Sequence, residues 1–448
     1  MADTKVGNLS SRGTVYADPS NRPAMLDIVS NLWHPESNPG GYLSLGVAEN
    51  TLMHDKLVHH ITKNFSLNSH ALTYGDSFSG SHGLKSAVAA FITRHFSSVQ
   101  PVLPHHVVVT TGLGPAIESC AFSLCDPGDG ILLGRPYYGT FPSDVASRAK
   151  AQIIPVSFGD IDPLGLDAIP FYEEALLDAR ERGIVTRAII LCNPHNPLGR
   201  CFSPQVLAAY MAFCQKHHIH LISDEIYALS VWENPDAPDA LPFRSVLSID
   251  TTGLIDPSLV HALWGMSKDF GSNGIRIGCI VSQNNNDFIH ALGANSYFTC
   301  PSSLADRATT ALLSDTAFVE SFIRTNSRLL SSRYVFTVRF LESHGVPYEK
   351  GANAGLFVWI DLLGYLATTI GARSSAELGT EEDRWALEAR VQAALLKQRV
   401  FLASGAVFGS DRPGWFRIVF AHDEMYLRQG LKRIIDAMGV LKAEMTQG

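Results

Sequence analysis

The chain has few cysteines, little positive charge and no long apolar run, and each shortage removes a class of protein. Its seven cysteines are scattered and never spaced Cys-x-x-Cys, so neither a disulfide framework nor a zinc site is expected. Acidic residues outnumber basic ones by 43 to 35, giving a net charge of −8. That balance argues against nucleic acid or an anionic membrane as a partner.

Apolar content is high overall but is never concentrated in one long stretch. No run of about 18 uncharged apolar residues could span a membrane. Residues 1–31 are polar and lack the apolar stretch of about 7 to 15 residues found in secretory signals. With 46% hydrophobic residues over 448 positions, the chain can bury a large core. We therefore expect a soluble, cytoplasmic, globular protein.

Short β-branched runs alternate with amphipathic segments in the middle of the chain, which is typical of buried parallel strands joined by crossover helices. Strands are expected at 106–110, 131–133, 152–156, 188–191, 220–223, 260–263 and 276–281. Helical patterns lie between them at 115–124, 172–182 and 204–217. The sequence therefore predicts an α/β fold, with a mainly parallel central sheet and flanking helices on both faces.

The pattern changes toward the carboxyl end. Two long helical stretches are followed by isolated strands and helices, at 287–313, 316–343, 355–361, 381–398, 415–420 and 424–437. This order predicts a smaller α+β domain, and no low-complexity linker or internal repeat interrupts it. We expect an N-terminal arm belonging to the small domain at 1–45, a large domain at 46–325 and a C-terminal small domain at 326–448.

A lysine follows one of the predicted strands and precedes a glycine-rich turn. An amine placed like that of Lys268 can form a Schiff base, and Arg276, eight residues later, can bind a phosphate. Glycine-rich loops with lysine and arginine are common, so this motif alone leaves a solvated surface lysine open.

Two further motifs also follow predicted strands. A carboxylate such as Asp224 can hold a pyridine nitrogen protonated, and Tyr227 can reach the phenolic oxygen of the same ring. The alternative for Asp224 is a strand-end carboxylate that caps a helix. Two X-Pro steps and a glycine within 192–199 project Asn196, whose amide can donate to that oxygen, and a turn without a ligand is the alternative there.

The fourth motif is the strand-to-helix turn Thr111-Gly112-Leu113-Gly114. Free N–H groups in such a turn can hold a phosphate at the positive end of the helix. The turn nearly matches the dinucleotide fingerprint, but Ile117 replaces the third glycine and no acidic residue closes a second strand about 20 residues later. A nicotinamide cofactor is therefore disfavoured.

Taken in order, these four motifs resemble the fold-type-I pyridoxal phosphate (PLP) enzymes of the class I and II aminotransferase superfamily, the PLP-dependent transferase fold. Within it, the chain is most similar to 1-aminocyclopropane-1-carboxylate (ACC) synthase-like proteins. The resemblance spans about residues 42–422 and is carried by Leu45-Gly46-Val47-Ala48-Glu49-Asn50, Asp126-Pro127-Gly128-Asp129, Pro136-Tyr137-Tyr138, Asn196-Pro197-Leu198-Gly199, Asp224-Glu225-Ile226-Tyr227-Ala228, Ser267-Lys268-Asp269, Asn353-Ala354-Gly355-Leu356-Phe357 and Gly414-Trp415-Phe416-Arg417.

The resemblance implies pyridoxal 5′-phosphate as the cofactor and a role for each matching residue. Lys268 would carry the cofactor and act as acid and base at the substrate Cα, while Asp224 would pair with the pyridine nitrogen. Tyr227 and Asn196 would bind the ring oxygen, and Tyr138 would stack on the ring.

The same resemblance implies how the phosphate is held. Arg276 and Ser267 would bind it together with the backbone N–H groups of Leu113 and Gly114. Tyr74 resembles the tyrosine that reaches the phosphate of the other subunit's cofactor, so a homodimer is implied.

For the substrate, the resemblance implies that Arg417 clamps the α-carboxylate through two contacts. Glu49, in the Ala-Glu-Asn motif, would help to recognise the rest of the molecule.

The chain departs from the family pattern at several positions. Gly265 stands where a serine is common, and Gly114 stands where a hydroxyl residue is common. A proline is missing from the turn at 403–406, and Tyr74-Gly75-Asp76 replaces a Tyr-His-Gly sequence. We expect the phosphate to be bound less tightly or by other groups, and the substrate pocket to differ.

The resemblance thus implies a PLP-dependent enzyme of amino acid metabolism that works on an α-amino acid through an external aldimine and a quinonoid. The first expectation is an ACC synthase-like lyase, which eliminates and cyclises S-adenosylmethionine or a related γ-substituted amino acid. An aminotransferase, and a carbon–sulfur lyase or other β/γ-elimination or replacement enzyme, are the alternatives. A catalytically inactive PLP-fold binding protein is a further one, against which the retained Lys268 argues.

Overall fold

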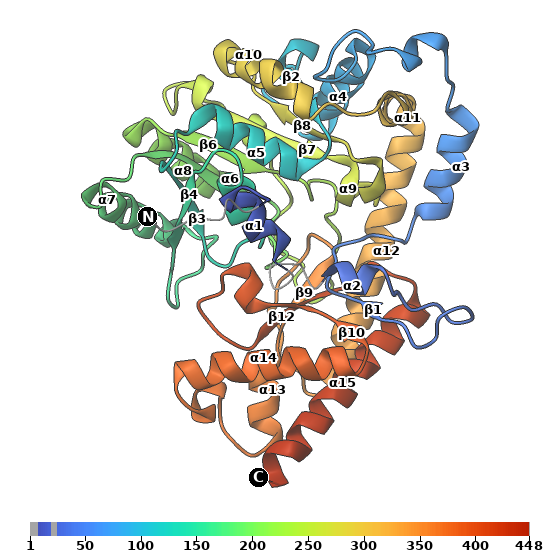
Figure 1. Cartoon of the computed structure of the whole chain (residues 1–448), viewed down its shortest axis with the longest axis vertical. Helices are drawn as coiled ribbons and strands as arrows, with labels where there is room; N and C mark the ends of the chain where they lie inside the picture. The colour runs from blue at the N-terminus through green and yellow to red at the C-terminus, as the bar shows by residue number, and fades with distance from the viewer. Residues whose placement is uncertain (1–7, 19–24, 448) are drawn as a thin grey trace.

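A seven-stranded sheet forms the centre of the larger part of the molecule, in the upper half of Figure 1. The computed structural model describes residues 8–18 and 25–447. In spatial order the strands are β2 (Val107–Thr110), β8 (Gly278–Val281), β7 (Val260–Gly265), β6 (His220–Asp224), β5 (Thr186–Cys192), β3 (Gly130–Gly134) and β4 (Gln152–Val156). All neighbouring pairs except those of β8 are parallel, so the predicted mainly parallel sheet is confirmed.

Strand β8 runs antiparallel to both of its neighbours, which the sequence reading did not foresee. The segment 266–277 joins β7 to β8 and contains only the short helices α9 (Met266–Asp269) and η7 (Asn273–Ile275). A parallel return usually needs a full crossover helix, so this short connection returns the chain antiparallel. As a result, Lys268 and Arg276 lie on one tight connection at the edge of the sheet.

Helices cover both faces of this sheet because its residues alternate in direction. On β3, Ile131 and Leu133 pack with one core cluster and Leu132 packs with the other. The first face is covered by α5 (Leu113–Leu124), α6 (Phe141–Ala146) and α10 (Asn286–Asn295). The second is covered by α4 (His82–His95), α7 (Ile169–Glu181), α8 (Pro204–His217) and α11 (Ser303–Ser314).

A second core lies in the lower half of Figure 1. It contains an antiparallel sheet of β11 (Ala403–Ser404), β12 (Trp415–Val419) and β9 (Phe357–Asp361), together with α13 (Leu362–Thr369), α14 (Glu381–Lys397) and α15 (Glu424–Gln447). Strand β1 (Leu43–Ser44) pairs with β10 (Val400–Phe401), so an N-terminal segment joins this C-terminal part. The smaller α+β part is as expected, while the exact domain boundaries stay a prediction.

Two helical expectations need correction. The stretch 287–313 is two helices, α10 and α11, separated by the short helix η8 (Ser296–Phe298) and a segment that contains Pro301. Proline disfavours helical backbone in the residue before it, which accounts for the break. The last helix continues ten residues beyond 437 and ends at Gln447. The remaining helices are α1 (Ser11–Ala17), α2 (Met25–Val29), α3 (His54–Asn64) and α12 (Thr316–Ser343).

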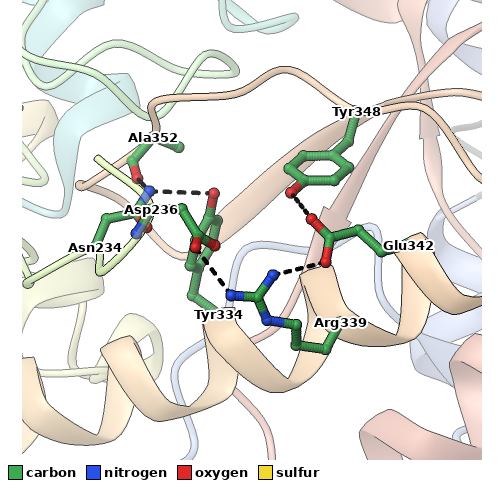
Figure 2. A network of polar contacts seen from close by, with 7 residues as sticks. All are labelled: Asn234, Asp236, Tyr334, Arg339, Glu342, Tyr348 and Ala352. Carbon is green, nitrogen blue, oxygen red and sulfur yellow. Dashed lines mark hydrogen bonds and ion pairs between the residues drawn. The ribbon is translucent and has the colours of Figure 1, made fainter. Parts of the chain in front are cut away.

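Helix α12 runs from the upper to the lower part of the molecule (Figure 1) and is tied to a loop after β6 by the polar network of Figure 2. Asn234 donates to Tyr334 Oη at 3.3 Å and to the Ala352 carbonyl at 2.7 Å. Arg339 pairs with Asp236 at 2.9 Å and donates to Glu342 at 2.7 Å. The network fixes the position of the helix that links the two cores.

No helix within residues 8–18 and 25–447 combines the length and the apolar character needed to cross a membrane.

Candidate active site

Most of the candidate side chains meet at the carboxyl end of the central parallel strands. Asp224 is the last residue of β6, Asn196 follows β5, and Lys268 follows β7 by one short turn. The strand register places Cys192 of β5 beside Asp224, and Asp224 beside Leu263 of β7. Ligands of open α/β sheets bind at this edge, so the fold itself brings these distant parts of the sequence together.

Lys268 points at the chain segment that follows β1. Its Nζ donates to the Ala48 carbonyl at 2.5 Å, and Asn273 Nδ2 donates to the same oxygen at 3.4 Å. Burial lowers the pKa of Lys268 to about 8, the positive charge of Arg417 lowers it further, and Glu49 raises it. The amine is therefore easily neutral near pH 8, as an amine nucleophile or base must be.

Asp224 is a buried carboxylate with few partners. Only Oδ1 has a hydrogen bond in the structure, from the backbone N–H of Ile226 at 3.1 Å. Burial raises the pKa of Asp224 to about 7, and the negative charge of Asp144 raises it further. A cationic N–H group placed against this carboxylate would favour its charged form.

Tyr227 lies beside this carboxylate and is buried as well. Its ring packs edge-to-face on Phe357, with 5.2 Å between the ring centroids. Burial raises the pKa of the Tyr227 hydroxyl, while the nearby charge of Arg417 lowers it. The hydroxyl is therefore a neutral hydrogen-bond donor within reach of the positive charge at Arg417.

Arg417, on β12 of the smaller part, reaches the same region. It is 4% exposed and donates to Asn196 Oδ1 at 3.0 Å and to the Gly46 carbonyl at 2.7 Å, while its Nε has no partner. The rings of Phe357 and Phe408 flank it, with centroids 5.2 and 4.8 Å from Cζ. Burial lowers the pKa of Arg417, and in the described part of the chain no carboxylate forms an ion pair with it. A buried guanidinium without a counter-ion suits an anionic ligand.

The turn between β2 and α5 forms a second, separate anion-binding geometry. Gly112 has a φ of +112°, a conformation that residues with a side chain rarely adopt. Arg276 Nη2 donates to the Thr111 carbonyl at 2.9 Å, so its guanidinium lies against the turn. The N–H groups of Leu113 and Gly114 are in the first turn of α5, where they lack helical partners. Positive charge and free N–H groups together suit a phosphate.

The two family departures in this region have steric surroundings. A Cβ on Gly265 would lie 2.6 Å from the Ile277 carbonyl oxygen and 3.0 Å from Gly278 Cα, so a serine does not fit without a backbone shift. Beside Gly114, a carboxylate oxygen of Asp144 lies 3.6 Å from where a Cβ would stand. Burial raises the pKa of Asp144 to about 6.

Gly265→Ala is therefore expected to destabilise the fold by about 1 to 3 kcal/mol, since it forces extra volume against backbone atoms. Thermal unfolding followed by circular dichroism measures this as a lower Tm. Gly274→Ala is the matched control, because a Cβ there meets no atom within 4 Å and the residue lies on the same connection. Equal Tm values for the two variants would contradict the steric explanation.

The other expected site residues lie around this cluster. Ser267 is half-buried beside Lys268 on α9, and Glu49 is half-buried close enough for its charge to act on Lys268. Tyr138 is 37% exposed and packs edge-to-face on Phe141. Tyr74 is 83% exposed, and no contact joins it to the other candidates. It is the one candidate that the fold of a single chain does not bring to the site.

Sequence reasoning missed three polar residues at this site. Asn273 shares the Ala48 carbonyl with Lys268, Asp144 lies beside the phosphate turn, and Asp269 anchors the lysine segment. Asp269 stands within the Ser267-Lys268-Asp269 motif, which was the one available signal. Asn273 and Asp144 belong to no spacing pattern, and only the fold brings them in.

The groups present fit the expected cofactor. A buried carboxylate with a free oxygen suits a protonated pyridine nitrogen, and the Asn196 amide, whose oxygen is taken by Arg417, keeps its N–H donors for a ring oxygen. The amine of Lys268 suits an aldehyde carbon. Asn273 Oδ1 and Arg417 Nε are buried and without partners, as expected of a polar site that receives a ligand.

Comparison with known proteins points to the same family. The model of the class I and II aminotransferase family matches residues 41–434. A probable aminotransferase of Aspergillus oryzae, aclI, is 33% identical over 89% of this chain and 91% of its own length. The ACC synthase-like protein 1 of Takifugu rubripes is 32% identical over 92% of this chain, which spans only 64% of that protein. A mouse relative, 31% identical over 90% of this chain and 66% of its own length, is named a probable inactive ACC synthase-like protein 2.

The fold also matches solved structures. A Thermus thermophilus aspartate aminotransferase tetra mutant in complex with tryptophan superposes with a TM-score of 0.71 at 20% identity, covering 96% of this chain and 100% of that one. The family match extends over most of the sequence and includes every candidate residue. The chain therefore belongs to the class I and II aminotransferase family, with the PLP-dependent fold of type I and pyridoxal 5′-phosphate as its cofactor.

Proposed function

We propose that this protein is an enzyme that acts on an α-amino acid and begins by removing the proton from its Cα. The observation that carries this proposal is Arg417, a buried guanidinium with an unpaired Nε and two flanking aromatic rings. A carboxylate is the anion whose two oxygens match a planar guanidinium. Arg417 would therefore hold the α-carboxylate.

Lys268 would then serve as the base. Pyridoxal phosphate, when bound, draws electron density away from the Cα of an attached amino acid. The Lys268 amine, whose pKa is lowered to about 8, can accept the Cα proton at neutral to mildly alkaline pH. Asp224, Tyr227 and Asn196 would orient the cofactor ring, and Arg276, Ser267 and the N–H groups of the turn would hold its phosphate. Tyr138 would cover the ring from one side.

For the step that follows, we favour an ACC synthase-like reaction, in which a γ-substituent leaves and the ring closes. Glu49 supports this choice, since it places a negative charge close to Lys268, where a cationic sulfonium such as that of S-adenosylmethionine would be stabilised. The similarity to ACC synthase-like proteins supports it as well. The substrate class would then be γ-substituted amino acids with a cationic leaving group.

An aminotransferase is the second candidate, and the similarity to a fungal aminotransferase favours it. Both reactions need the same carboxylate clamp and the same base. They differ in where the proton taken up by Lys268 goes next, which these residues share in common.

One incubation series distinguishes the candidates. The protein with pyridoxal phosphate is incubated with S-adenosylmethionine, with amino acids plus 2-oxoglutarate, and with cysteine conjugates, and the products are identified by mass spectrometry. ACC formed from S-adenosylmethionine is the expected result. A 2-oxo acid with glutamate would indicate an aminotransferase, and a released thiol with pyruvate a carbon–sulfur lyase. No product from any of them would favour a binding protein.

We further propose a homodimer in which Tyr74 completes the site of the partner subunit. Tyr74, Phe78 and Tyr297 form a chain of edge-to-face rings on the surface, with centroids 5.7 and 5.4 Å apart. Leu72 and Phe298, 76% and 72% exposed, extend this apolar area. Aromatic side chains on this scale are typical of a surface that a second copy covers.

Light scattering is expected to show twice the mass of one chain. Mixing Lys268→Ala with Tyr74→Phe subunits should restore about a quarter of wild-type activity, because each mixed dimer holds one intact composite site and random exchange makes half of the dimers mixed. A stable, active monomer, or no recovery in mixed dimers of verified composition, would contradict the shared site.

A further inference from the structure

The carboxylate of Asp269, the residue after Lys268, is bonded to two other segments of the site. It is 2% exposed, accepts from Ser230 Oγ at 2.7 Å and from the Leu229 N–H at 3.1 Å, and also accepts from Trp264 Nε1 at 2.9 Å. These donors occupy both carboxylate oxygens.

The donors come from the two strand ends that build the site. Leu229 and Ser230 follow Tyr227 on the segment that leaves β6 after Asp224, while Trp264 is next to the last residue of β7. One side chain therefore joins the segment that carries Lys268 to the segment that carries the ring-binding residues. No other side chain in the described ranges makes this connection through hydrogen bonds.

The main chain of the same segment is held from the opposite side. Asn326 Nδ2 of α12 donates to the Asp269 carbonyl at 3.5 Å, and its Oδ1 accepts from Asn50 at 2.9 Å. Asn50 is two residues after Ala48, whose carbonyl accepts from Lys268. Lys268 thus lies in a frame whose two sides are anchored through Asp269.

We propose that Asp269 is a positioning residue that fixes the distance of the Lys268 amine from Asp224 and Tyr227. This inference rests on the proposed function, because it assigns to Asp269 a part in presenting Lys268 to the cofactor. Asp269 itself touches neither the reacting atoms nor the cofactor-binding groups at the phosphate turn.

The chemistry of the pocket explains why an aspartate is needed. Burial raises the pKa of Asp269 to about 7, whereas the hydrogen bonds from Trp264 and Ser230 lower it. An asparagine keeps the size but replaces one acceptor oxygen by an NH₂ group, which would face donors. Buried donors left without an acceptor are costly, so the lysine segment is expected to shift rather than keep its place.

The test compares Asp269→Asn with Glu225→Gln, a matched control. Glu225 is also fully buried and accepts from Ser245, Val246 and Ser223, but its partners lie on a segment that does not carry Lys268. Full-length variants are checked for Tm, for the apparent Kd of pyridoxal phosphate by fluorescence, for visible circular dichroism of the bound cofactor, and for borohydride trapping on Lys268.

For Asp269→Asn we expect an apparent Kd at least about tenfold higher, a reduced visible circular dichroism signal and less trapping on Lys268 per folded molecule, consistent with loss of a buried network. Glu225→Gln should lower Tm but stay within about threefold of wild type in Kd, as expected for distant sites. Equal cofactor properties for both variants would overturn the positioning role. Absence of trapping in the wild-type protein would instead overturn the proposed function.

If Asp269→Asn does not fold, Ser230→Ala provides the second variant. It removes one donor from the carboxylate, leaves the aspartate in place, and should produce the same changes to a smaller extent. Wild-type cofactor properties in a folded Ser230→Ala protein, together with an unfolded Asp269→Asn, would mean that Asp269 serves stability alone.

Discussion

Lys268→Ala is expected to lower kcat by about a thousandfold or more, because it removes both the amine that carries the cofactor and the base that takes the Cα proton. A positioned general base by itself contributes about 10² to 10⁴ in rate. Steady-state kinetics at saturating pyridoxal phosphate measures the loss. The substrate should still bind, since Arg417 and its partners are untouched.

Lys85→Ala is a suitable control for this prediction. Lys85 is also half-buried, donates to Ser79 Oγ at 2.6 Å, and has a pKa lowered by burial. It lies outside the cluster of site residues and should keep turnover close to wild type. A similar kcat for Lys268→Ala and wild type would remove Lys268 from the chemistry.

Arg417→Lys is expected to reduce kcat/KM by about 30-fold to several thousandfold. An ammonium cannot reproduce the planar two-point contact with a carboxylate. Losing one partner of a buried charged pair costs about 2 to 5 kcal/mol, which at about 1.36 kcal/mol per decade gives this range. Affinity for pyridoxal phosphate should change little, because Arg417 lies away from the phosphate turn.

Arg433→Lys is the matched control for Arg417. Arg433 is partly buried on α15 and donates to the carbonyl oxygens of Gly41 and Arg399, with no part in the site. Its replacement should affect Tm more than kcat/KM. Near wild-type efficiency of Arg417→Lys on every amino acid tested would show that the carboxylate is bound elsewhere.

The sequence predicted the layered fold because local signals were strong in every central strand. Runs such as Ala188-Ile189-Ile190-Leu191 can only be buried on both faces, and the structure places them in the middle of the sheet. The direction of β8 escaped prediction, since the hydrophobic pattern of a strand is the same in either direction. Only the length of the 266–277 connection carries that information.

The site was predictable where chemistry needs a particular residue type next to a strand end, as for Asp224 and Lys268. Its supporting contacts were not, because they depend on which distant segments meet. The pairing of Arg417 with Asn196 joins residues 221 positions apart, and Gly265 is required by the close approach of Ile277. Neither has a signature in the order of residues.

The most direct test of the central claim is to map where pyridoxal phosphate attaches. The purified protein is saturated with the cofactor, reduced with borohydride, digested and sequenced by mass spectrometry. A pyridoxyl group on Lys268, with loss of the visible absorption band and no labelling in the Lys268→Ala protein, is the predicted result. A pyridoxyl group on a different lysine, or full retention of the band in Lys268→Ala, would contradict the assignment of the site.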